Sequence, residues 1–80
     1  MHSLRAYLLL KTRDTIATDI VNNIRQNYEQ SYVTGATVYG WYDAFIELEV
    51  TTPARITHII NELKRTQPNL THIETVIEKP

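Results

Sequence analysis

The spacing of apolar residues changes along the chain, and each change marks an expected element of secondary structure. From Arg5 to Thr12 the run RAYLLLKT is short, apolar and bounded by charge, which predicts a strand buried on at least one face. From Thr15 to about Tyr28 apolar residues recur mainly at steps of three and four, with polar residues between them. This spacing predicts an amphipathic helix whose N-cap is Asp14 or Thr15.

The middle of the chain predicts two strands joined by a tight turn. Residues Ser31 to Tyr39 are rich in β-branched and aromatic types, and Gly35 among them indicates a bulge or a close approach of the backbone. After the letters GWY, a second strand starts at Asp43 and alternates apolar and polar residues as far as Val50. We therefore expect an antiparallel hairpin, with Gly40 supplying the permissive backbone in its turn.

A second helix and a last strand complete the pattern. Thr52 is suited to cap the helix and Pro53 to be its first residue. After the breaker QPN, the segment LTHIETVIEK predicts a final strand with Leu70 or Ile73, Thr75 and Ile77 on one face. The helix residues that we expect in the core are Ile16, Ile20, Ile24, Ile56, Ile60 and Leu63.

The element order β-α-β-β-α-β predicts an α+β fold, the ferredoxin-like sandwich, in which a four-stranded antiparallel sheet carries both helices on one face. The other face of the sheet is then open, and we expect Phe45 on it together with Tyr7 or Leu9. An exposed apolar patch of this kind marks an interface in many proteins. A homodimer joined through the sheets is therefore expected, built from one domain that spans residues 1–80.

Length and charge narrow the classes of function. A chain of 80 residues buries only about 60–65% of its unfolded surface, which favours self-association. No apolar run approaches the roughly 20 residues of a membrane span, and the first residues lack the features of a signal peptide, so we expect a cytoplasmic protein. The net charge is −1 and the charges are interspersed, so we expect no direct nucleic-acid binding and no membrane partner.

Several activities known on this fold need residues that are absent from the sequence. A metal chaperone needs a Cys-x-x-Cys pair, and the chain has no cysteine. An RNA-binding sheet places stacking aromatics and a basic residue on its third strand, where this chain has Asp43 and neither Lys nor Arg at the start of the motif. A carboxylate there would repel phosphate, which disfavours RNA binding.

Catalytic chemistry has few candidates. The three histidines have no metal-ligand spacing and are expected to be solvated, and no serine stands in a glycine-flanked elbow. We therefore expect no metal and no cofactor. One enzymatic alternative stays open, namely a small cofactor-free oxygenase of the dimeric α/β-barrel type whose pocket is lined by Trp41, Tyr42 and His72.

The hairpin and the end of the chain carry a more specific pattern. The hairpin residues are Val38, Tyr39, Gly40, Trp41, Tyr42 and Asp43, followed by AFIELEV; later come Pro68, Asn69 and Leu70, then Ile73 and Thr75. The chain resembles the C-terminal effector-binding (RAM) domain of the Lrp/AsnC transcription regulators over nearly its whole length. Tyr39, Asn69 and Ile73 stand where that family has threonine, glycine and threonine. Tyr39 and Ile73 fall near the family's effector pocket, which implies a changed ligand or none.

The resemblance implies a non-enzymatic domain that senses an amino acid or a related small effector and that oligomerises. In the family, dimers assemble into octamers or similar rings, so a decamer-like ring is a further possibility. The chain has no room for the family's helix-turn-helix, which implies a stand-alone sensor acting on transcription through a full-length Lrp/AsnC regulator. A purely structural assembly domain without a ligand is the remaining alternative.

The implied ligand would need a defined set of contacts. A free amino acid carries a carboxylate, which backbone N–H groups from Gly40 to Tyr42 can bind, and an ammonium, which Asp43 can accept. Thr75 can add a hydroxyl. The same residues also fit a structural role, with Asp43 accepting a backbone N–H in the turn. The expected ligand-binding residues are Tyr39, Gly40, Trp41, Tyr42, Asp43, Ile73 and Thr75.

Overall fold

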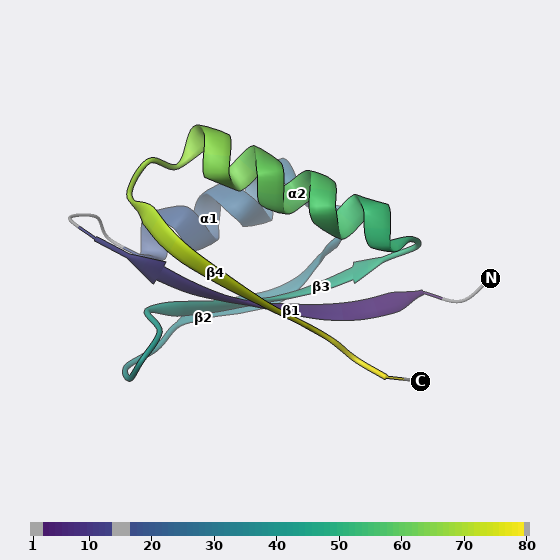
Figure 1. Ribbon diagram of the computed structural model, residues 1–80, viewed down its shortest axis with the longest axis horizontal. Coiled ribbons are helices and arrows are strands. Elements are labelled where there is room, and N and C mark those ends of the chain that lie inside the picture. The colour runs from purple at the N-terminus through teal and green to yellow at the C-terminus, as the bar shows by residue number, and fades with distance from the viewer. Residues whose placement is uncertain (1–2, 14–16, 80) are drawn as a thin grey trace.

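The computed structural model of the protein describes residues 3–13 and 17–79. The chain forms β1 (Leu4–Thr12), α1 (Ala17–Asn27), β2 (Tyr32–Thr37), β3 (Ala44–Val50), α2 (Pro53–Thr66) and β4 (Leu70–Ile77). Both helices cover the same face of the sheet (Figure 1), so the expected ferredoxin-like α+β sandwich is confirmed. The expected N-caps Asp14 and Thr15 and the expected core residue Ile16 lie outside the described residues.

The register of the sheet decides which side chains face the helices. The strand order is β2-β3-β1-β4, and each neighbouring pair is antiparallel. In the central strand β1, Leu10 lies between Ala44 of β3 and Ile73 of β4. Because side chains alternate along a strand, Leu8 and Leu10 point to the helices while Tyr7 and Leu9 point to the open face.

The core lies between the helices and the covered face of the sheet. Of the helix residues expected in it, Ile20, Ile24, Ile56 and Leu63 are buried. Ile60 is only half-buried, because the stripe of α2 that contacts the sheet runs through Ile56, Ile59 and Leu63. The sheet contributes Ala6, Leu8, Leu10, Ala44, Ile46, Leu48 and Val50 to this core. Full burial of a single large aliphatic side chain stabilises a fold by about 1.5–3 kcal/mol.

Strand β2 is shorter than expected and its irregularity lies elsewhere. The strand starts at Tyr32, because Ser31 is buried in a turn, with its N–H donating to Tyr28 at 2.9 Å. The register shifts between Tyr32 and Thr34, so the expected bulge at Gly35 is wrong by one or two residues. The alternative expected for Gly35, a close approach, is confirmed. A Cβ there would lie 2.8 Å from Ile46 Cδ1.

Replacing Gly35 by alanine is expected to lower the free energy of unfolding by about 1–3 kcal/mol, because the added methyl overpacks the core side of the sheet. The nearest atoms include the backbone oxygen of Phe45 at 3.2 Å, which cannot move without disturbing the ladder. Urea unfolding of Gly35→Ala and of the exposed neighbour Ala36→Ser measures this. Equal midpoints for the two variants would contradict the close approach.

Helix α2 starts as its sequence indicates, although its cap differs. Pro53 opens the helix, and Thr52 has the extended backbone of an N-cap residue. The Thr52 side chain makes no capping hydrogen bond, and its carbonyl accepts the N–H of Arg55 at 3.2 Å instead. Proline at the first position lacks one of the four backbone N–H groups that the start of a helix leaves without an intrahelical partner. Within residues 3–13 and 17–79, neither helix is long and apolar enough to cross a membrane.

Candidate functional site

The loop of residues 38–43 joins β2 to β3 and bends away from the helices (Figure 1). It is longer than the expected three-residue turn, because both flanking strands are shorter. Gly40 has a φ of +132°, a conformation that side chains rarely adopt, so the expected need for glycine is confirmed. Tyr39 is fully exposed and Trp41 is 78% exposed, so the loop presents two aromatic rings to solvent.

Asp43 closes this loop through three hydrogen bonds. Its N–H donates to the carbonyl of Leu10 at 2.8 Å, and its own carbonyl accepts the N–H of Val38 at 2.9 Å. Its carboxylate Oδ2 accepts the N–H of Thr12 at 2.9 Å, which ties the end of β1 to the loop. The other carboxylate oxygen, Oδ1, has no hydrogen-bond partner among the described residues. Asp43 therefore has a structural contact and an acceptor left over for a donor such as an ammonium group.

A cleft of about 330 Å³ opens beside Asp43, on the side of the sheet that the helices cover. It lies where the ends of β1 and β2 meet the start of α1. Its walls carry a carboxylate and four hydroxyl groups, a lining suited to a small polar molecule. The lining residues are Thr12, Ala17, Thr18, Thr37, Val38, Tyr39 and Asp43. Its three threonines were not among the expected site residues. They stand at or next to the ends of β1, α1 and β2, and the sequence alone places these ends only roughly.

The expected site residues fall into three places. Tyr39 and Asp43 line the cleft, whereas Trp41 and Tyr42 take part in contacts on the open face. Ile73 and Thr75 lie on β4, where they pair with Leu10 and Leu8 of β1. Strand β1 lies between β4 and β3 in the sheet. Two strand spacings amount to about 10 Å. One copy of the chain therefore does not bring Thr75 to Asp43, and a joint role for the two would need a second copy.

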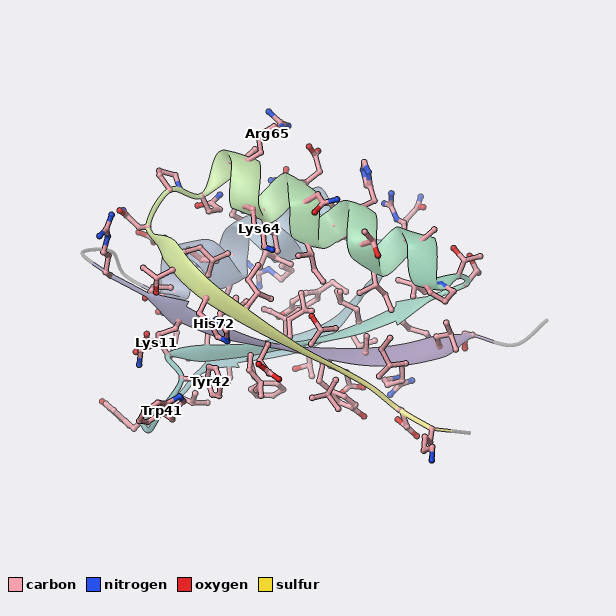
Figure 2. The ribbon with its side chains drawn as sticks, in the orientation of Figure 1. Lys11, Trp41, Tyr42, Lys64, Arg65 and His72 are labelled. Carbon is pink, nitrogen blue, oxygen red and sulfur yellow. The ribbon has the colours of Figure 1, made fainter. Side chains whose placement is uncertain are left out.

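A strip of aromatic and charged side chains crosses the open face at the loop end of the sheet (Figure 2). The Nζ of Lys11 donates to the carbonyl of Trp41 at 2.9 Å and lies 5.2 Å from the centre of its ring. The ring of Tyr42 stacks on His72, with 6.3 Å between centroids and 22° between planes. Lys11 and His72 are paired in the sheet, so β1 and β4 together hold the loop. His72, expected to be only solvated, is exposed but has this contact.

Replacing Lys11 by methionine is expected to loosen the loop. The variant loses the hydrogen bond to Trp41 and the cation–π contact, which at an exposed site is worth about 0.5–1 kcal/mol. Trp41 is the single tryptophan, so its fluorescence reports on the loop directly. Acrylamide should quench Lys11→Met more strongly than the wild type, whereas Lys64→Met on α2 should behave as the wild type. Equal quenching of all three proteins would show that Lys11 does not restrain the loop.

The rest of the open face has an apolar centre flanked by charges. Leu9 and Phe45 are paired neighbours at this centre and are half-buried. Toward the end of the sheet that holds the chain termini, Arg5 forms ion pairs with Glu47 and Glu49. Nearby, a hydrogen bond to Glu78 and partial burial raise the pKa of the Tyr7 hydroxyl. The expectation that Phe45, Tyr7 and Leu9 lie on the open face is confirmed.

Comparisons with known proteins identify relatives of the fold. No family model and no curated protein matches the sequence. Among solved structures, the hypothetical protein PHS023 from Pyrococcus horikoshii superposes with a TM-score of 0.80 at 21% identity, over 96% of this chain and 90% of that one. The protein FFRP-DM1 superposes with a TM-score of 0.80 at 21% identity, over 95% of this chain and 99% of that one.

A third solved structure is the transcriptional regulator NMB0573 from Neisseria meningitidis in complex with L-Met. It gives a TM-score of 0.74 at 9% identity, over 96% of this chain and 50% of that one. At these identities a likeness establishes architecture and leaves the ligand and the activity to be argued from the site. The chain therefore has the βαββαβ fold of these proteins, including that of a regulator that was solved with an amino acid.

Proposed function

We propose that the protein is an effector-binding domain of the Lrp/AsnC type, which binds a free amino acid or a related small molecule and catalyses no reaction. The observation that carries this proposal is the cleft at the mouth of the hairpin, where Asp43 keeps one carboxylate oxygen without a partner among the described residues. The residue pattern of the hairpin supports it. So does the shared fold with a regulator solved in complex with L-Met.

The chemistry of the cleft fits a zwitterion. The ammonium group of the ligand pairs with Asp43, in a charge-assisted hydrogen bond of the strong kind. For the carboxylate, the N–H group of Tyr39 makes no backbone hydrogen bond within the described parts of the chain, and the hydroxyls of Thr12 and Thr37 lie in the same cleft. Val38 and Tyr39 offer an apolar wall to the ligand side chain.

The proposal extends to assembly, because one copy of the chain does not bring Thr75 to Asp43. We propose a dimer joined through the open faces of the sheets and a larger ring of such dimers. Ile73 and Thr75 pair with Leu10 and Leu8 on the helix side of the sheet, so the contact between dimers in the ring brings them near the loop of another copy. Ligand binding then shifts the assembly by the difference in its affinity for the two states. The ring acts on transcription through a partner regulator that carries the DNA-binding part.

Calorimetric titration with each of the twenty amino acids, with the mass in solution followed by light scattering, tests the proposal. One or a few amino acids are expected to release heat and to change the mass. Titrations without heat and without a change in mass would remove the sensing function and leave a purely structural assembly domain.

A small oxygenase is the second candidate, and one contact favours it. Tyr42 and His72, two of the three residues expected in its pocket, stack on each other. Trp41 is turned to Lys11 instead, and none of these three rings lines the cleft beside Asp43. Oxygen consumption in the presence of an aromatic substrate would support the enzyme, and its loss in His72→Phe would assign the reaction to this stack.

A further inference from the structure

The loop of residues 38–43 reaches both faces of the sheet. Tyr39 lines the cleft on the helix side, whereas Trp41, two residues later, contacts Lys11 on the open face (Figure 2). Gly40 stands between them, and its φ of +132° allows the backbone to turn from one face to the other. The backbone of residues 39–41 therefore connects a contact on the open face with the rim of the cleft.

The tip of this loop has few contacts with the rest of the chain. Among the described residues, the backbone hydrogen bonds of the loop are made by Val38 and Asp43 at its base. A Cβ at Gly40 would meet no atom within 4 Å, and Tyr39 is fully exposed although it borders the cleft. Packing therefore does not fix the position of Tyr39, and its place at the rim depends on the backbone that carries it.

Two contacts restrain the tip from the open face. The Nζ of Lys11 donates to the carbonyl of Trp41 at 2.9 Å and lies 5.2 Å from the centre of the Trp41 ring. Tyr42, one residue closer to the base of the loop, stacks on His72. A single ammonium group thus contacts both the backbone and the side chain of Trp41, only two residues from Tyr39.

We propose that Lys11 is a positioning residue for the cleft beside Asp43. Through Trp41 it holds Tyr39 at the rim, where the phenol ring forms a wall for the side chain of a bound amino acid. The inference rests on the proposed function, because it requires an amino acid in that cleft. Lys11 does not line the cleft itself, so its effect on binding passes through Tyr39. Asp43 is tied to β1 by its own hydrogen bonds and keeps its place without Lys11.

A double-mutant cycle on amino-acid affinity tests this path. The probe is the one of the twenty amino acids that the wild-type full chain binds most tightly in calorimetry. Lys11→Met should weaken its binding about two- to fivefold, the equivalent of one exposed cation–π contact. Tyr39→Ala should weaken it at least as much, and Lys11→Met added to Tyr39→Ala should have no further effect. Two independent contributions would instead add.

Two control variants separate positioning from a general loss of structure. Lys11→Arg keeps a charged donor that can stack on Trp41, so it should bind the same amino acid within about twofold of the wild type. Lys64→Met removes a lysine from α2 and should bind as the wild type. A loss in Lys64→Met equal to that in Lys11→Met would contradict a specific role for Lys11.

An NMR measurement without any amino acid distinguishes failure of this inference from failure of the proposed function. Lys11→Met should lower the backbone order parameters of Tyr39 and Gly40 and leave that of Asp43 unchanged, and Lys11→Arg should restore them. If the wild type binds none of the twenty amino acids, the proposed function fails, and the order parameter of Tyr39 still decides whether Lys11 holds the rim. Three results would overturn the inference: unchanged affinity in Lys11→Met, additive losses in the double variant, or an unchanged order parameter of Tyr39.

Discussion

Replacing Asp43 by asparagine is expected to weaken amino-acid binding by at least about a hundredfold while the fold stays intact. A hydrogen bond to a charged group contributes about 1.5–3 kcal/mol, and a hundredfold change corresponds to about 2.7 kcal/mol. Asparagine keeps an oxygen that can accept the N–H of Thr12, so the tie between the loop and β1 survives. What the variant loses is the negative charge that pairs with the ammonium group.

Two further variants separate the roles of this side chain. Asp43→Ala removes the acceptor of Thr12 as well as the charge, so it should also lower the free energy of unfolding by about 1–2 kcal/mol. Glu29→Gln changes the net charge by the same amount at the far end of α1 and should bind as the wild type. Calorimetry with the amino acid that the wild type binds, together with urea unfolding, measures both effects. Wild-type affinity in Asp43→Asn would assign the ammonium to another group.

The spacing of apolar residues and the positions of turn and helix-breaking residues were sufficient to predict the fold. Each strand and helix has its own apolar spacing, and the faces that follow from it were right for Ile46, Thr75 and Phe45. The position of the irregularity in β2 was not predictable, because it depends on how Tyr32 and Gly35 pack against Ile46 across the sheet. The local sequence identified a glycine at which the chain is approached too closely for a side chain. It contained no information on where the register would shift.

The candidate site was predictable only as far as it is local. Gly40 and Asp43 stand in one loop, and their backbone and hydrogen-bonding roles follow from residue type and position. The contact of Lys11 with Trp41 and the stack of Tyr42 on His72 each join residues about thirty positions apart in the chain. Alternation predicts the face of each strand but leaves the register between distant strands undetermined. The cleft likewise needs strand ends and a helix start to meet.

Replacing Phe45 by glutamate is expected to convert the proposed dimer into monomers. Phe45 lies opposite Leu9 and Ala36 at the apolar centre of the open face, and Glu47 is on the same face two residues along. A second sheet packed there would bury the new carboxylate without a counter-charge, at a cost of at least about 2 kcal/mol in each copy. A twofold interface buries two of them, so the dissociation constant should rise by about a thousandfold.

Sedimentation velocity over a range of concentrations measures this change, and circular dichroism checks that the fold is retained. Thr57→Glu places the same charge on the exposed side of α2 and should remain dimeric. A Phe45→Glu protein that stays dimeric would put the interface on another surface.

The effect of Phe45→Glu on amino-acid binding is equally informative. Because β1 separates Thr75 from the loop within one copy, a monomeric variant that has also lost its amino acid indicates a site completed by a second chain. A monomer that still binds the amino acid would assign the whole site to the cleft beside Asp43.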